Sequence, residues 1–204
     1  MFHEIIVARF LLFRVCSKQA TLMKKSLFIL AASAGLLAGA TAFTLFSNDW
    51  TPVTDQAKVS FEMPNEGTAG TLGGLKTTIS FNPANPAESK IEATVDPSTI
   101  NTGVEGKDTH IKSADFFDVA KYPTIRFVSE KVTATAAGFI ATGKLTIKDS
   151  VKTVDIPFTF EPKGDNEGVF KGHMEIFYGD FGVNKKSKSG KDKVKITIEV
   201  PVKK

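Results

Sequence analysis

Apolar and polar residues alternate through most of the chain after residue 57. Val59, Phe61 and Met63, for example, are separated by charged or polar neighbours. Successive side chains of a strand point to opposite faces, so each such run predicts a strand with one buried face. The runs with this pattern are residues 58–63, 75–81, 91–95, 125–129, 139–147, 154–160, 170–176 and 194–202. The sequence therefore predicts about eight strands.

Short polar turns separate these runs. The segment 82–86 contains two prolines, and the segment 164–168 contains two glycines together with Asp and Asn. Proline lacks a backbone donor, so a strand has to end there. Short turns join antiparallel neighbours. The pattern therefore predicts an all-β protein, an antiparallel meander closed into a barrel of eight strands.

One segment departs from the strand pattern. In residues 108–120, Ile111 and Phe116, or Asp115 and Val119, lie at helical spacing. We therefore predict one short helix over residues 108–120, inserted between strands. Pro123 follows it, and the residue before a proline is pushed out of the helical region.

A different pattern precedes the strands. Two lysines after Met23 are followed by an uncharged apolar stretch over residues 26–46, with small residues at Ala40 and Ala42. A basic end, an apolar segment and a small-residue site are typical of a secretory signal peptide. We expect cleavage after Ala42, one domain over residues 43–204, and a periplasmic or secreted protein.

Residues 1–22 form a second apolar patch before the signal peptide, where a mature fold would have no need of one. We interpret residues 1–42 as a signal peptide with a mis-started leader, whose true start is Met23; an extended basic region is the alternative. An uncleaved anchor is a third interpretation. Residues 27–46 are twenty uncharged residues, about the length that spans a bilayer.

Composition narrows the classes of partner. The whole chain has a net charge of +4 and a pI near 9.0. Residues 1–42 hold five basic residues and one acidic residue, which leaves 21 of each in the remainder. A neutral domain lacks the basic surface that displaces phosphate counterions, so no nucleic-acid partner is expected. Cys16, the only cysteine, lies in the leader, so neither a disulfide nor thiol chemistry is expected.

Residues 138–144 have the spacing of a phosphate-binding P-loop. Leu145 stands where that motif needs Ser or Thr, and the segment alternates like a strand with no helix after it. We therefore interpret the match as accidental, with Lys144 on the surface and Gly143 as a small residue on a bent barrel strand.

Other candidate chemistry is sparse. His110 and His173 are far apart and form no metal-binding pair, so no metal and no cofactor is expected. Ser98 and Ser113 are the least implausible nucleophiles, and neither lies in a nucleophile elbow. We expect both to bond to nearby backbone. No residue supports an enzyme.

A basic segment precedes the last strand. Its lysines are Lys185, Lys186, Lys188, Lys191 and Lys193. Such a loop is either merely solvated or makes transient contact with anionic headgroups at a membrane surface.

Three stretches resemble the YceI-like family. Residues 108–127, DTHIKSADFFDVAKYPTIRF, are similar to its D-x-H-L-x-S-x-D-F-F-D and Y-P-x-I-x-F runs. Residues 143–147, GKLTI, and 179–183, GDFGV, are similar to its G-x-L-T-I and D-F-G-[IV] segments. The resemblance extends over roughly residues 50–202 and implies a lipocalin-like barrel of eight antiparallel strands. In bacterial members the family is usually exported and encloses a polyisoprenoid chain.

The chain departs from the family pattern at three places. Gln56 and Ala57 stand where a His-Ser pair is common, Asp149 replaces the glycine after L-T-I, and Gly179 replaces the Arg before D-F-G. These changes leave the barrel intact and bear on how a headgroup would be recognised.

We predict that the protein binds or carries an apolar lipid chain, an isoprenoid quinone or polyprenyl lipid, inside the barrel. The alternatives are a structural or stress-related envelope protein with a filled barrel, and a lipid-modifying enzyme. A homodimer is left open. The residues expected to line the apolar cavity are Phe61, Ile79, Phe81, Phe116, Phe127, Phe139, Leu145, Ile156, Phe158, Met174 and Ile196.

Overall fold

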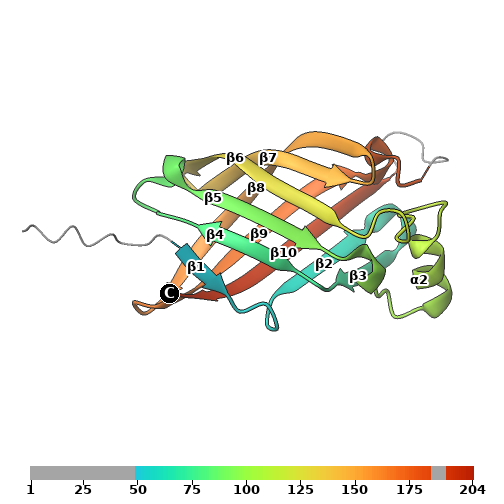
Figure 1. Cartoon of the computed structure of the whole chain (residues 1–204), viewed down its shortest axis with the longest axis horizontal. Helices are drawn as coiled ribbons and strands as arrows, with labels where there is room; N and C mark the ends of the chain where they lie inside the picture. The colour runs from blue at the N-terminus through green and yellow to red at the C-terminus, as the bar shows by residue number, and fades with distance from the viewer. Residues whose placement is uncertain (1–48, 185–191) are drawn as a thin grey trace, which may run out of the picture. The chain divides into compact units, whose positions relative to one another are not determined.

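Ten strands form one antiparallel sheet that curls on itself in the computed structural model, which describes residues 49–184 and 192–204 (Figure 1). The predicted cleavage site after Ala42, the candidate anchor 27–46 and Cys16 lie outside these residues. The strands are β1 (Asp49–Pro52), β2 (Lys58–Met63), β3 (Thr68–Leu72), β4 (Lys76–Ser80), β5 (Lys90–Val95), β6 (Ile125–Thr135), β7 (Gly138–Ile147), β8 (Ser150–Lys163), β9 (Glu167–Phe177) and β10 (Lys193–Lys203).

The sheet closes through β1. This strand pairs with β4 through Trp50 and Ile79, and with β10 through Thr51 and Lys203. β2 pairs with the earlier part of β10, so β1 and β2 lie end to end along one neighbour. In the same way β3 pairs with β2 and β4 pairs with β1, so β3 and β4 together occupy one position. The ten strands therefore occupy eight positions around a closed barrel, which confirms the predicted eight-stranded antiparallel barrel.

One end of the barrel is filled by an aromatic cluster, which we define as Trp50, Phe81, Phe139, Phe158, Phe160 and Phe170. Phe81 lies at its centre, 1% exposed, with four of the other rings at centroid distances of 4.9–5.6 Å. The Trp50 indole N–H donates to the Phe81 carbonyl at 3.2 Å, so its polar atom is satisfied. Edge-to-face pairs of this kind add to the energy of burial.

The helix α2 (Glu105–Lys112) lies across the opposite end of the barrel (Figure 1). The structure confirms one short helix in this region, with different bounds from the predicted 108–120: it begins three residues earlier and stops at Lys112. Ser113 is extended, and its hydroxyl donates to the His110 carbonyl at 2.7 Å. The Phe117 amide then donates to Ile111, which turns the chain back over the barrel instead of continuing the helix.

Lys148 ties this returning segment to the barrel. It lies in the two-residue turn between β7 and β8 with a φ of 53°, a conformation that is uncommon for a residue with a side chain. Its ammonium donates to the Phe116 carbonyl at 2.6 Å and to the Gly182 carbonyl at 3.2 Å. Gly182 follows the short helix η4 (Tyr178–Phe181). One charged group therefore joins the segment after α2 to η4.

Gly143 allows two strands to approach closely at a bulge. The pairing of β6 with β7 shifts register between Ser129 and Lys131, opposite Gly143. A Cβ atom at Gly143 would lie 2.2 Å from the Val128 carbonyl oxygen and 2.8 Å from the Phe127 ring. Backbone cannot move aside as a flexible side chain could, so glycine is required here.

We predict that Gly143→Ala lowers the free energy of unfolding by about 1–3 kcal/mol, because the added methyl group overpacks the bulge. Gly106→Ala is the matched control: Gly106 lies in α2 with open space around its Cβ position, and alanine there should stabilise by about 0.4–1 kcal/mol. Urea unfolding of both variants measures the difference. Equal stability of the two would contradict the close approach at the bulge.

Candidate ligand-binding cavity

An apolar cavity of about 190 Å³ lies inside the barrel between the aromatic cluster and α2. Strands from all around the barrel supply its wall, among them β4 through Ile79, β6 through Phe127 and β10 through Ile198. Each of these side chains comes from an alternating run, so the pleat directs it inward. The cavity is a space from which polar groups are almost wholly absent.

Nine of the eleven residues predicted to line a cavity do lie on a cavity wall. Phe116 lines a second cavity, described below. The members that line the barrel cavity are Phe61, Ile79, Phe127, Leu145, Ile156, Phe158, Met174 and Ile196.

Phe81 and Phe139 line neither cavity. Their rings pack edge to face at 4.9 Å inside the aromatic cluster. Both face inward as the alternation requires, but they lie at the filled end of the barrel. Alternation predicts the face of a residue and not its height along the barrel axis.

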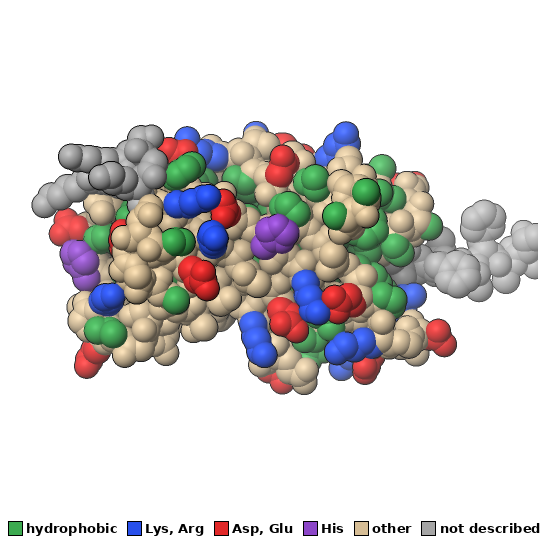
Figure 2. Space-filling view, turned by 180° about the vertical axis from the view of Figure 1, so that it is seen from behind, with side chains coloured by type: hydrophobic (Ala, Val, Ile, Leu, Met, Phe, Trp, Pro, Cys, Tyr) green, Lys and Arg blue, Asp and Glu red, His purple; other side chains and the backbone are tan. Residues whose placement is uncertain are grey.

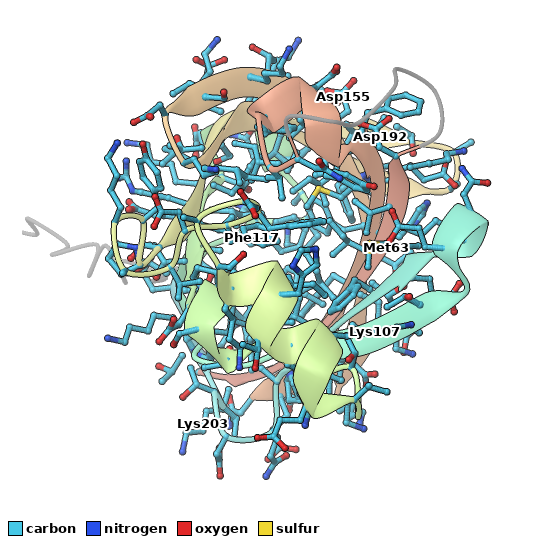
Figure 3. The ribbon with its side chains drawn as sticks, turned by 90° about the vertical axis from the view of Figure 1, so that its right-hand side faces the viewer. Met63, Lys107, Phe117, Asp155, Asp192 and Lys203 are labelled. Carbon is cyan, nitrogen blue, oxygen red and sulfur yellow. The ribbon has the colours of Figure 1, made fainter. Side chains whose placement is uncertain are left out.

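A second cavity of about 230 Å³ lies beneath α2, at the mouth of the barrel. Figure 3 looks onto this end, with Met63, Lys107 and Phe117 labelled near the opening. We call this space the mouth cavity. It shares part of its wall with the barrel cavity, so the two adjoin. The shared residues are Phe61, Leu72, Phe117, Tyr178 and Val183.

Polar groups gather in the mouth cavity. The Tyr178 hydroxyl donates to the Glu66 carboxylate at 2.5 Å. The Lys107 ammonium donates to the Thr68 hydroxyl at 2.9 Å, and that hydroxyl donates to the Glu66 carbonyl at 3.2 Å. None of these four residues was predicted from the sequence, because they come from four separate elements and Glu66 and Tyr178 are 112 positions apart.

Two polar residues, Thr77 and Ser129, lie within alternating runs at positions that the pattern assigns to inward faces, and both are already hydrogen-bonded. The Thr77 hydroxyl donates to the Glu92 carbonyl at 2.7 Å. The Ser129 hydroxyl accepts from the Ile91 amide at 2.8 Å. Neither is therefore aimed at the middle of the cavity as a reactive group.

The other candidate residues have structural surroundings. Lys144 lies on strand β7 and donates to the Thr153 hydroxyl at 2.7 Å, so residues 138–144 form a strand and not a phosphate loop. His110 packs edge to face on Phe116 at 4.7 Å. His173 is exposed on β9. Within residues 49–184 and 192–204, no three His, Cys, Asp or Glu side chains form a group able to hold a metal.

Ser98 and Lys193 are likewise bonded to other residues. The Ser98 amide donates to the Asp96 carboxylate at 2.8 Å, and hydrogen bonding to Ser98 lowers the pKa of Asp96. Lys193 pairs with Glu175. The other four lysines of the basic segment lie outside the described residues.

Positive and negative side chains are interspersed on the face shown in Figure 2. No helix in the described part of the chain is long and apolar enough to cross a bilayer.

Comparison with known proteins agrees with this geometry. A curated relative from Pseudomonas savastanoi, described as a UPF0312 protein, is 34% identical over 175 residues, which cover 79% of this chain and 88% of the relative. The crystal structure of Burkholderia cenocepacia BcnA is similar with a TM-score of 0.66 and 28% identity, covering 72% of this chain and 97% of BcnA.

A more distant structure shares the fold alone. It is described as a polyisoprenoid binding domain from Saccharophagus degradans implicated in plant cell wall breakdown. It has 10% identity, a TM-score of 0.57, and coverage of 77% of this chain and 98% of that domain. The model of the YceI-like domain matches residues 50–202, which is most of the chain. The protein therefore belongs to the YceI-like family.

Proposed function

We propose that this protein binds a long apolar lipid chain, such as that of an isoprenoid quinone or polyprenyl lipid, inside its barrel and without catalysis. The observation that supports this most is the apolar cavity of about 190 Å³, blocked at one end by the aromatic cluster and adjoining a mouth cavity at the other. Such a space suits a chain that enters tail first.

The energetics favour an apolar chain. Burial of each methylene group contributes about 0.8 kcal/mol, so an isoprenoid tail needs few polar contacts to bind tightly. The two cavities together fall within the range of roughly 300–1,000 Å³ that is usual for ligand sites. A chain that occupies both would pass between Phe117 and Tyr178, which line both.

A purely structural barrel is the main rival. Protein interiors are normally packed with few voids larger than a water molecule, because unfilled space loses dispersion contacts. A cavity of this size inside the sheet therefore favours a binding role. The engagement of Thr77 and Ser129 with backbone groups favours binding over an enzyme acting on the chain. The polyisoprenoid binding domain with the same fold adds a precedent for the ligand class.

We predict that Ala141→Trp abolishes lipid retention. Ala141 is 2% exposed and lines the barrel cavity, so an indole there would occupy ligand volume. After lipid removal, its melting temperature should stay near that of the lipid-free parent. Lipid extraction and calorimetry measure the two properties. The control is Val151→Trp, at a position 57% exposed on β8, which should retain lipid.

A filled barrel would respond in the opposite way. The indole would then force strain of about 1–3 kcal/mol and lower the melting temperature. That result, with no lipid in the parent, would end the carrier interpretation.

We further propose that the protein is exported to the cell envelope. The support is the basic, apolar and small-residue pattern after Met23. Intact mass of the protein recovered from the envelope should correspond to residues 43–204. A membrane-bound species that retains residues 27–46 would instead indicate an anchor.

A further inference from the structure

We propose that the aromatic cluster limits the length of the bound chain, so that the protein takes chains of about three or four isoprene units in preference to longer ones. Phe158 and Phe170 are the two members of the cluster that line the barrel cavity, and we call them the cavity floor. The proposal rests on the proposed function and names the class of chain that the same cavity holds.

The floor is solid because rings from different sides of the barrel meet behind it. Phe158 lies on β8 and Phe170 on β9, whereas Phe81 follows β4, whose neighbours in the sheet are β1 and β5. The Phe81 ring nevertheless lies 5.6 Å from that of Phe158 and 5.2 Å from that of Phe170, measured between centroids. Phe81 is only 1% exposed, so its ring is packed on all sides. The end of an apolar chain would therefore stop at the floor.

The cavity volumes determine how much chain fits between the floor and the mouth. The barrel cavity is about 190 Å³ and the mouth cavity about 230 Å³, which is about 420 Å³ together. An apolar cavity of roughly 150 Å³ holds one benzene molecule. On that scale the two cavities hold about seventeen carbon atoms, which corresponds to about three or four isoprene units.

Shorter and longer chains bind less well for different reasons. A shorter chain leaves part of the cavity empty, and the wall there lacks dispersion contacts. A longer chain cannot pass the floor, so its surplus carbon atoms stay outside the mouth, where each methylene group remains in water. A lipid bilayer buries those carbon atoms and so competes better than the protein for a long chain. The preferred length therefore follows from the position of the floor.

Competition between prenols of different length tests this proposal. Lipid-stripped protein is incubated with phosphatidylcholine vesicles that contain equal amounts of geraniol, farnesol, geranylgeraniol and solanesol, which share one headgroup and increase in chain length in that order. The protein is then separated from the vesicles, and the bound prenols are extracted and measured by mass spectrometry. We expect farnesol and geranylgeraniol to dominate, and solanesol to be bound at least about tenfold less than either.

Phe158→Ala should lower the floor. It removes the ring that stacks on Phe139 at a centroid distance of 5.4 Å and so extends the cavity toward that residue. The space released is about that of a benzene molecule. The bound mixture should therefore shift toward longer prenols by about one isoprene unit.

Ala141→Leu changes the cavity in the opposite direction and serves as a second test should Phe158→Ala fail to fold. Ala141 is 2% exposed and lines the barrel cavity, so the larger side chain takes up ligand volume. The bound mixture should shift toward shorter prenols. Phe177→Ala is the matched control, because Phe177 is 40% exposed and lines neither cavity. Loss of this ring should leave the mixture unchanged.

The outcomes separate this inference from the proposed function. Binding of solanesol equal to or greater than that of geranylgeraniol would overturn the length limit and leave the carrier function standing. A preference for shorter prenols that neither Phe158→Ala nor Ala141→Leu changes would overturn the role of the floor. If no prenol binds, the proposed function fails and this inference fails with it.

Discussion

The four residues of β1 keep the barrel closed, because they bond to β4 on one side and to β10 on the other. A closed sheet leaves no unpaired edge and separates its inner face from water. The inward residues can then be apolar along every strand without exposure. Trp50, on this same strand, also packs on Phe160 and bonds to the Phe81 carbonyl, so closure and the filling of one end depend on the same short segment.

Filling one end makes the two ends of the barrel chemically different. The one polar side-chain atom of the aromatic cluster, the Trp50 N–H, is bonded to the Phe81 carbonyl, whereas among the described residues the mouth beneath α2 presents a carboxylate, an ammonium and two hydroxyls. In the proposed function, a bound lipid would lie with its tail toward Phe158 and Phe170. Lys148 helps to keep this mouth in place, because it joins the segment after α2 to η4.

Much of this arrangement could be predicted from the sequence, since alternation depends only on which face of a strand is buried. It placed residues such as Phe61 and Ile196 on the inner face correctly. It could not show that β1 and β2 share one position along β10, because that depends on pairing between distant residues. Nor could it separate Phe81, which fills the closed end, from Ile79, which lines the cavity two residues earlier.

The end of the helix and the contacts at the mouth were harder to predict from the sequence, for a different reason. The spacing of Asp115 and Val119 favoured a helix beyond Ser113, but the hydrogen bond from Ser113 to His110 and the turn through Phe117 end it at Lys112. The pair formed by Glu66 and Tyr178 has no local sequence signal, because closure of the barrel brings the short helix η1 (Pro64–Glu66) and η4 together. Such contacts between loops at one end of a barrel follow from topology and not from periodicity.

Native mass spectrometry of the protein, purified from its own cells in detergent-free buffer, shows directly whether the barrel holds a lipid. We expect a population that carries one extra mass equal to a long-chain lipid, which is lost on delipidation and absent from Ala141→Trp. A parent protein that is folded and free of lipid, and that takes up none from an extract of its own membranes, would contradict it.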